Sequence, residues 1–402
     1  MMKIFPSAYF RNRHSSWNLT VLVPVLLLAW PRGAWSADTP AASAKLIAAI
    51  DRVVEKQGVT ADEPGVAVWI QQPGQVLFQK GYGVTSLKTK EPITPKTNFE
   101  LASLSKTITA TAVLILHDRG KLSIDDDLRK VLPMLAKFHP ERPIHVRDLL
   151  RHVSGLPDYL AMDDVPKRHA DFWDNDDYVR FFAAQGRKLK LDFPADSKYE
   201  YNNTNYFLLA SVVKQVSGKS FGRFVRDEIF LPAGMEHTFV YESPESVPTP
   251  SPGRNRAVGY EWNKKKREWR ETWGTPPARS ETMLVVGDGS IWSSLEDLAR
   301  WDEVVRERKL LKPETWKLAL TPHKTKDGEL NHYCLGWDVY FDEPTEPYGY
   351  GHDGSWGGFH TSYYRYLTED RSTVILSNRG TFDTDKLWEA IGRVLEKHLP
   401  SH

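Results

Sequence analysis

The β-rich segments of this chain lie near its two ends, and this order limits the folds that it can adopt. Residues 65–71 and 75–81 are β-rich and are separated by a Gln-Pro-Gly turn at residues 72–74, which is typical of a hairpin. Residues 359–367 and 372–377 are again β-rich and are joined by a short polar turn. We therefore expect one sheet that combines strands from both ends of the chain.

Apolar residues recur at helical spacing beside these strands. The pattern predicts terminal helices over residues 42–57 and 383–399. It also predicts a buried helix over residues 103–119, which Gly120 ends, and a further helix that begins with a capping pattern at residues 293–296. Helices should therefore flank the sheet.

The middle of the chain has a different character. Residues 121–284 mix amphipathic segments with loops rich in Pro, Asp and Gly, which indicates a mainly helical lobe. We predict an α/β fold of the α+β type, in which an antiparallel sheet flanked by helices is built from residues 42–120 and 285–400. The helical lobe is inserted between these parts, so that residues 37–400 form one domain.

The N-terminus has the pattern of an export signal. Basic residues precede an apolar run at residues 19–30, and a small-x-small cleavage motif follows at residues 34–36. The run contains Pro24 and is shorter than the roughly 20 residues that span a bilayer. We predict a signal peptide over residues 1–36 and a periplasmic or secreted mature protein, with an uncleaved anchor as the alternative.

Charge and cysteine content bear on the partners of the chain. It has 53 Lys+Arg and 52 Asp+Glu, so no net field attracts nucleic acid or an anionic membrane. Cys334 is the single cysteine, so an intrachain disulfide is impossible. Its surroundings, residues 333–337, indicate a strand and a buried thiol rather than a catalytic one. We expect no nucleic-acid partner and no stable membrane span after signal cleavage, and the oligomeric state stays open.

Ser103 and Lys106 form the first candidate catalytic pair. A serine hydroxyl is a weak nucleophile unless a proton acceptor lies within hydrogen-bond reach. Residues three apart share a helix face, so Lys106 should point at Ser103, and burial would lower the lysine pKa toward that of a base. The main-chain N–H of Ser103, in the first helical turn, could bind an oxyanion. The alternative is a solvated helix start with Ser103 as its cap.

Tyr201 and Asn203 form a second candidate pair. A tyrosine hydroxyl near an ammonium group can act as a base or a proton shuttle. An asparagine amide can accept from the lysine and also donate to a substrate carbonyl. A plain polar loop before a helix is the alternative interpretation.

A third candidate group lies in the glycine-rich stretch at residues 350–358. His352 should point into a cleft, while Gly354 lets the backbone approach a ligand closely. The main-chain N–H of Ser355 could be a second oxyanion donor. The alternative is a glycine-rich turn with a surface histidine.

Taken together and in this order, the three groups resemble the serine β-lactamase-related family, which includes class C β-lactamases and penicillin-binding proteins. That family uses serine-x-x-lysine, tyrosine-x-asparagine and a third motif, which is lysine-threonine-glycine in true class C enzymes and histidine-x-glycine in many esterase and peptidase relatives. Flanking segments are also similar to the family, and the resemblance spans about residues 42–399. These segments are residues 81–84, 99–102, 149–157 and 335–337.

The resemblance implies an active site in a cleft between the sheet and the helical lobe. Ser103 would form the acyl-enzyme, and Lys106 and Tyr201 would transfer its proton. Asn203 and His352 would orient the substrate and tune Tyr201. The substrate would be a small molecule or peptide with an ester or amide bond.

His352 departs from the class C pattern, because it replaces the lysine that gives a fixed positive charge. We therefore expect an esterase, a D-amino-acid peptidase or a weak β-lactamase. The alternative is a non-catalytic or slowly deacylating protein that binds cell-wall peptides.

An α/β-hydrolase site and a metal site both fit the sequence poorly. The nucleophile motif of α/β-hydrolases is glycine-x-serine-x-glycine, and its nearest match, residues 353–357, begins with aspartate. A metal site at His145 and His152, or at residues 125–127, lacks paired-ligand spacing. We expect these residues at solvated loops and helix ends, and we expect no metal or cofactor.

Overall fold

A computed structural model describes most of the chain after its N-terminal segment. The described residues are 44–73, 75–138, 142–162, 173–243, 246, 255–272, 284–343 and 346–399. They belong to one unit, residues 40–402. The predicted signal peptide lies outside the described residues.

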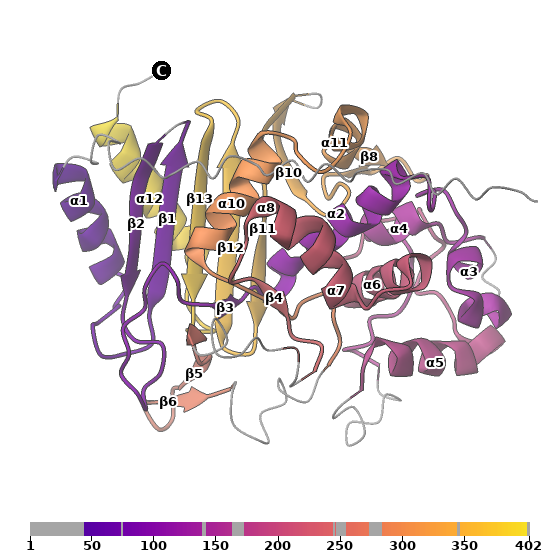
Figure 1. Cartoon of the computed structure of the whole chain (residues 1–402), viewed down its shortest axis with the longest axis horizontal. Coiled ribbons are helices and arrows are strands. Elements are labelled where there is room, and N and C mark those ends of the chain that lie inside the picture. The colour runs from indigo at the N-terminus through magenta and orange to yellow at the C-terminus, as the bar shows by residue number, and fades with distance from the viewer. Residues whose placement is uncertain are drawn as a thin grey trace, which may run out of the picture. The chain divides into compact units, whose positions relative to one another are not determined.

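A six-stranded antiparallel sheet with the order β10-β11-β12-β13-β1-β2 forms the framework (Figure 1). Its strands are β1 (Val66–Gln72), β2 (Gln75–Tyr82), β10 (Asp338–Glu343), β11 (Glu346–Trp356), β12 (Phe359–Tyr366) and β13 (Arg371–Ser377). Strand β1 pairs with β13, and Val68 lies opposite Ile375. This pairing confirms the prediction that strands from both ends of the chain share one sheet.

Both faces of the central strands are buried. In β1, Val66, Val68 and Ile70 belong to a cluster with apolar residues of α1 (Ala44–Glu55) and α12 (Thr384–His398). The alternate residues Ala67 and Trp69 belong to a second cluster, which includes α10 (Leu295–Arg306). Since side chains alternate across a strand, helices must cover both faces. The terminal helices and α10 lie close to their predicted positions.

The remaining elements lie mainly between β2 and α10 in the sequence. A three-stranded sheet has the order β3-β7-β4 and is formed by β3 (Phe99–Glu100), β7 (Ile291–Ser293) and β4 (Phe239–Val240). Two hairpins pair β5 (Tyr260–Asn263) with β6 (Glu268–Glu271) and β8 (His323–Lys324) with β9 (Leu330–Asn331). The helices are α2 (Ser105–Asp118), α3 (Leu128–Val131), α4 (Val146–Leu150), α5 (Asn175–Gln185), α6 (Asn203–Ser217), α7 (Phe221–Val225), α8 (Leu231–Ala233) and α11 (Pro313–Ala319). Short helical turns are η1 (Ala102–Leu104), η2 (Pro133–Lys137), η3 (Gly186–Lys188) and η4 (Arg226–Phe230).

Helix α2 lies at the centre of this arrangement, and every residue from Ser105 to Leu116 is buried. It packs against α6, while α3, α4 and α5 lie further from the large sheet and α8 lies beside α10 (Figure 1). An α/β fold with an inserted helical part is therefore confirmed. No described helix combines the length and the apolar character that crossing a membrane requires.

The prediction of a strand around Cys334 is wrong, because residues 333–337 form a turn before β10. Cys334 N–H donates to Trp337 O at 2.8 Å, and Gly336 has φ +90°. A Cβ at Gly336 would lie 2.3 Å from the Ala110 Cβ, so only glycine lets this turn pack on α2. Burial raises the pKa of the Cys334 thiol to about 12, which makes it unreactive.

The end of β13 is tied to β1 by the buried side chain of Asn378. Its Oδ1 accepts from Gly65 N–H at 2.7 Å, and its Nδ2 donates to the main-chain oxygens of Val84, Thr85 and Val258 at 3.2, 3.3 and 3.0 Å. One side chain thereby satisfies backbone groups from three separate segments.

We predict that Asn378→Ala lowers the free energy of unfolding by about 3 kcal/mol, because buried backbone groups lose their partners. Denaturant unfolding of the purified protein measures this loss. As a control, Asn263→Ala removes a side chain that accepts from Lys265 and Lys266 N–H at an exposed hairpin, and should cost less than about 1 kcal/mol. Equal losses in both variants would contradict the role given to Asn378.

Candidate active site

Ser103 lies in a tight strand-to-helix turn. The chain leaves β3, passes through η1 and enters α2 directly. Ala102 has φ +50°, a left-handed conformation that is strained for a residue with a side chain. Leu101 N–H donates to Ile291 O at 2.8 Å and anchors the turn to β7. Ser103 is therefore held at the N-terminus of a buried helix, as predicted from the sequence.

The amine of Lys106 is buried and has three partners. Nζ lies 2.9 Å from Ser103 Oγ, 3.0 Å from Asn203 Oδ1 and 2.7 Å from the main-chain oxygen of Asp288. The last two oxygens can only accept hydrogen bonds. A neutral amine has two N–H bonds, so both are used for these oxygens and the lone pair faces Ser103 Oγ. In this geometry Lys106 is able to remove the proton of Ser103.

Burial lowers the pKa of Lys106 to about 8, although the carboxylates of Asp288, Asp158 and Glu100 oppose this shift. A lysine with this pKa is neutral in roughly a tenth of molecules at pH 7. Burial therefore gives Lys106 a neutral fraction near neutral pH, as a proton acceptor would require.

Tyr201 lies beside both Ser103 and Lys106, and the Lys106 Nζ is 5.0 Å from the centroid of its ring. As a whole residue it is 38 % exposed, but its hydroxyl is buried against the protein and hydrogen-bonded to Ser103. Burial raises the pKa of the phenol well above 10, and the hydrogen bond between Tyr201 and Ser103 only partly opposes this. Tyr201 is thus a neutral phenol at physiological pH and is suited to relay a proton.

His152 supports Tyr201, which corrects the expectation that it lies in a solvated loop. The imidazole is fully buried, and its ring centroid lies 4.4 Å from that of Tyr201. Its Nδ1 accepts from Asn202 N–H at 3.1 Å and lies 3.1 Å from Asn205 Nδ2. Burial lowers the pKa of His152 well below its ordinary value, so the ring is neutral.

Asn203 is the first residue of α6. Asn202 caps this helix, because its side chain accepts from Thr204 N–H at 2.8 Å. The cap places Tyr201 before the helix and Asn203 within its first turn. Ser103, Lys106, Tyr201 and Asn203 therefore meet at one point, as the family resemblance implied.

His352 does not point into a cleft. The residue is 2 % exposed, and its Nδ1 donates to Asp353 O at 2.6 Å, since a carbonyl can only accept. Nε2 then accepts from the Tyr333 hydroxyl at 2.9 Å. Burial, together with the charge of Lys106, lowers the pKa of His352 to about 3. The imidazole is neutral and both of its nitrogens bind the protein.

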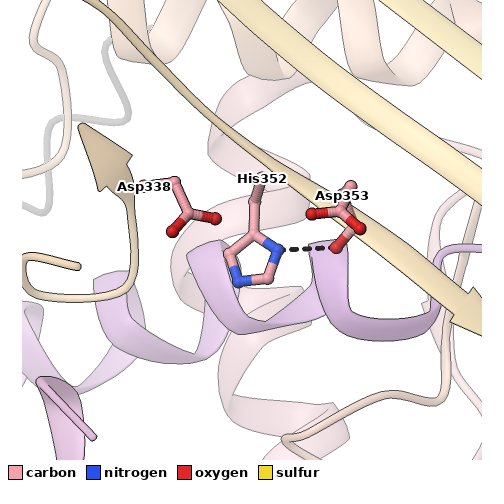
Figure 2. A group of neighbouring side chains, drawn as sticks. All are labelled: Asp338, His352 and Asp353. Carbon is pink, nitrogen blue, oxygen red and sulfur yellow. Dashed lines mark hydrogen bonds between the residues drawn. The ribbon is translucent and has the colours of Figure 1, made fainter. Parts of the chain in front are cut away.

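Two carboxylates flank this imidazole (Figure 2). Asp338 and Asp353, with His352, place one ligand atom each within 4.8 Å of one another. Burial and the charge of Asp353 raise the pKa of Asp338 to about 7. A metal ion here would have to displace Tyr333 or the main-chain oxygen of Asp353 from the ring, so we assign none to this group.

Gly354 lies directly against the nucleophile turn. The pairing of β10 with β11 ends at Gly351, and η1 contacts β11 beyond that point. A Cβ at Gly354 would lie 2.4 Å from Leu101 O and 2.8 Å from Ser103 N, so the close approach requires glycine. Ser355 follows at the exposed end of the strand.

Comparison with known proteins agrees with this arrangement. A family model described as Beta-lactamase matches residues 50–396. The chain belongs to the beta-lactamase family. Within this family of serine hydrolases, it is 31 % identical over 315 residues to penicillin-binding protein 4* of Bacillus subtilis (strain 168), which covers 76 % of this chain and 66 % of that protein.

It is also 26 % identical over 318 residues to a D-aminopeptidase of Gluconobacter oxydans (strain 621H), which covers 78 % of this chain and 56 % of that protein. The beta-lactamase-family chain thus spans less than two-thirds of the length of either relative. FmtA from Staphylococcus aureus has a similar solved structure, with a TM-score of 0.71 at 21 % identity over 90 % of this chain and 93 % of that one. This likeness confirms the predicted fold.

Several residues of the site were not predicted from the sequence. Asp288 supplies a main-chain acceptor to Lys106, Asp158 binds Asn203, and Tyr333 binds His352. Asp158 directly follows the similar segment at residues 149–157, and Tyr333 lies two residues before the similar segment at 335–337, so each had a nearby signal in the sequence. Asp288 lies in an ordinary loop far from the three motifs.

We predict that Gly354→Ala slows the reaction of Ser103 with a fluorophosphonate about a hundredfold, because the added Cβ pushes the nucleophile turn out of place. Intact mass against time measures the rate. Gly392→Ala is the matched control, since a Cβ there meets nothing within 4 Å and lies in α12. Its labelling rate should stay unchanged, and an unchanged rate for Gly354→Ala would contradict the packing argument.

Proposed function

We propose that this chain is an exported serine hydrolase that cleaves an ester or amide bond through an acyl-enzyme on Ser103. One observation carries the proposal: the two acceptor-only oxygens bound to Lys106 leave its lone pair facing Ser103 Oγ at 2.9 Å. The N-terminal signal pattern at residues 1–36 supports export.

The reaction has two stages. In the first, Lys106 takes the proton of Ser103 as Oγ bonds to the substrate carbonyl carbon, and the Tyr201 hydroxyl relays a proton to the leaving group. In the second, water attacks the acyl-enzyme, the acid is released, and Ser103 regains its proton. The main-chain N–H groups of Ser103 and Ser355 would hold the negatively charged oxygen in both stages.

The third motif favours esters and amides over β-lactams. A neutral His352 supplies no positive charge for a substrate carboxylate at pH 7. Asp338 and Asp353 lie beside it and would repel such a group when ionised. The relative named D-aminopeptidase supports amide substrates, although it is longer than this chain. Because the imidazole of His352 is neutral and bound to the Tyr333 hydroxyl, we give His352 a structural role and not one in substrate binding.

A second candidate function is that of a penicillin-binding-type protein that binds cell-wall peptides. Such a protein is non-catalytic, or its Ser103 becomes acylated and then loses the acyl group only slowly. The relative named penicillin-binding protein 4* favours this alternative. Nitrophenyl acetate separates the two functions, because a hydrolase gives a burst followed by steady turnover and a trapped acyl-enzyme gives a burst alone.

We predict that the mature protein gains one fluorophosphonate adduct and that Ser103→Ala gains none while keeping its fold, since the change only replaces a hydroxyl by a hydrogen. Intact mass and circular dichroism test both statements. Ser355→Ala keeps the main-chain N–H and is the matched serine control, which should still be labelled. An adduct on Ser103→Ala would place the nucleophile elsewhere.

After labelling, esters, D-amino-acid amides and a β-lactam are compared as substrates, and efficient β-lactam turnover would contradict the substrate assignment.

We predict that the acylation rate rises with pH up to a midpoint near 8. The active form of Lys106 is the neutral one and its pKa is about 8, so the rate should fall about tenfold per pH unit well below this value. Tyr201, with its raised pKa, and His352, with a pKa near 3, should add no step between pH 6 and 9. The burst rate with nitrophenyl acetate measures the profile. A flat rate over this range would exclude Lys106 as the base.

A further inference from the structure

The loop at residues 154–159 is bound along the start of α6. Ser154 Oγ donates to Asn205 Oδ1 at 2.6 Å, Thr204 Oγ1 donates to Pro157 O at 2.8 Å, and Tyr159 N–H donates to Thr204 Oγ1 at 2.8 Å. Residues 154–157 of the loop belong to the segment whose similarity to the family was noted from the sequence, Asp158 and Tyr159 directly follow it, and no catalytic step described above uses them. Its position beside Asn203 suggests what it does.

Asp158 determines which end of the Asn203 amide faces the lysine. One carboxylate oxygen, Oδ2, accepts from Asn203 N–H at 2.9 Å and from Asn203 Nδ2 at 3.0 Å. An ionised carboxylate has no hydrogen to donate, so it binds the NH2 end of the amide and turns the carbonyl end toward Lys106.

Tyr159 acts on the second acceptor of the lysine. Its buried hydroxyl donates to Asp288 Oδ2 at 2.8 Å, and the main-chain oxygen of the same aspartate accepts from Lys106 Nζ at 2.7 Å. The Tyr159 ring is held by Tyr178 and Phe207, with centroids 4.8 and 5.3 Å away. Two neighbouring residues thus each bind one of the two acceptor-only partners of Lys106.

We propose that Asp158 and Tyr159 are positioning residues that aim the lone pair of Lys106 at Ser103. The inference rests on the proposed function, because it concerns how the same base is oriented. If the Asn203 amide turned over, its NH2 group would donate to the neutral amine. The lone pair would then be occupied, and Ser103 would lose its proton acceptor.

Asp158 has a second effect that can be measured separately. Its carboxylate, like that of Asp288, raises the pKa of Lys106 against the larger opposite effect of burial. Removing the charge at Asp158 should therefore lower the pKa of the lysine, so that the neutral form appears at lower pH. A residue that only supported the fold would not move this midpoint.

The test compares Asp158→Ala and Asp158→Asn in the full mature protein, with fluorophosphonate labelling rates measured from pH 6 to 10. Asp158→Ala should label about a hundredfold more slowly, because the amide of Asn203 is no longer oriented. Asp158→Asn keeps a carbonyl oxygen that accepts from Asn203. It should recover most of the rate, and its midpoint should move to lower pH by roughly half a unit or more. Tyr159→Phe should slow labelling about tenfold without loss of the fold.

Asp148→Asn is the matched control. Asp148 is a buried helix-capping carboxylate that accepts from His145 N–H at 2.9 Å and interacts with His145, Asp196 and Arg142 rather than with Lys106. Asp148→Asn should leave the midpoint of the pH profile unchanged.

Two results would overturn the inference. The first is an Asp158 variant with the wild-type labelling rate. The second is a labelling rate that falls only in proportion to the loss of stability, with the midpoint of the pH profile unchanged. If wild-type protein is labelled at Ser103 and the Asp158 variants behave in this way, only the positioning role fails. If wild-type Ser103 is not labelled, the proposed function itself fails.

Discussion

The structure depends on one buried amine. Placing Lys106 inside the protein costs desolvation energy, and three oxygens around Nζ offset this cost. These oxygens come from η1, the start of α6 and the loop before β7, so the lysine holds together segments that are distant in the sequence. The same burial that has to be compensated lowers its pKa toward neutral pH. Stability of the core and reactivity of the site are therefore set by the same contacts.

The sheet performs a different task, which is to bring the third motif to the nucleophile. Strand β11 is longer than its pairing with β10, and the unpaired end of that edge is where η1 packs. Because Gly354 has no side chain, β11 packs directly on η1, and Ser355 therefore lies on a segment next to that of Ser103. Two residues before Gly354, the same strand supplies His352, which is neutral and bound to Tyr333.

Much of this arrangement could be predicted from residue spacing. The order of β-rich runs predicts the sheet, and Ser103, Lys106, Tyr201 and Asn203 follow from spacing and from the family resemblance. The rest depends on contacts that spacing does not encode. The orientation of His352 is decided by Tyr333 and by a main-chain oxygen, and His152 is buried because an aromatic ring covers it. Asp158 and Asp288 are separated by 130 positions; the first acts through its side chain and the second through its main-chain oxygen, and both look like ordinary loop residues in the sequence.

The pairing of β1 with β13 has a consequence for the newly made chain. The partner of Val66 is Ser377, so the centre of the sheet cannot close until the chain has been made through β13. Ser103 is made early, but Gly354 and Ser355, which complete its surroundings, are made about 250 residues later. A nascent or truncated chain that ends before β11 has the nucleophile without the site. The geometry around Ser103 is thus acquired only after β11 has been made, as a property of the folded domain rather than of the segment that carries the serine.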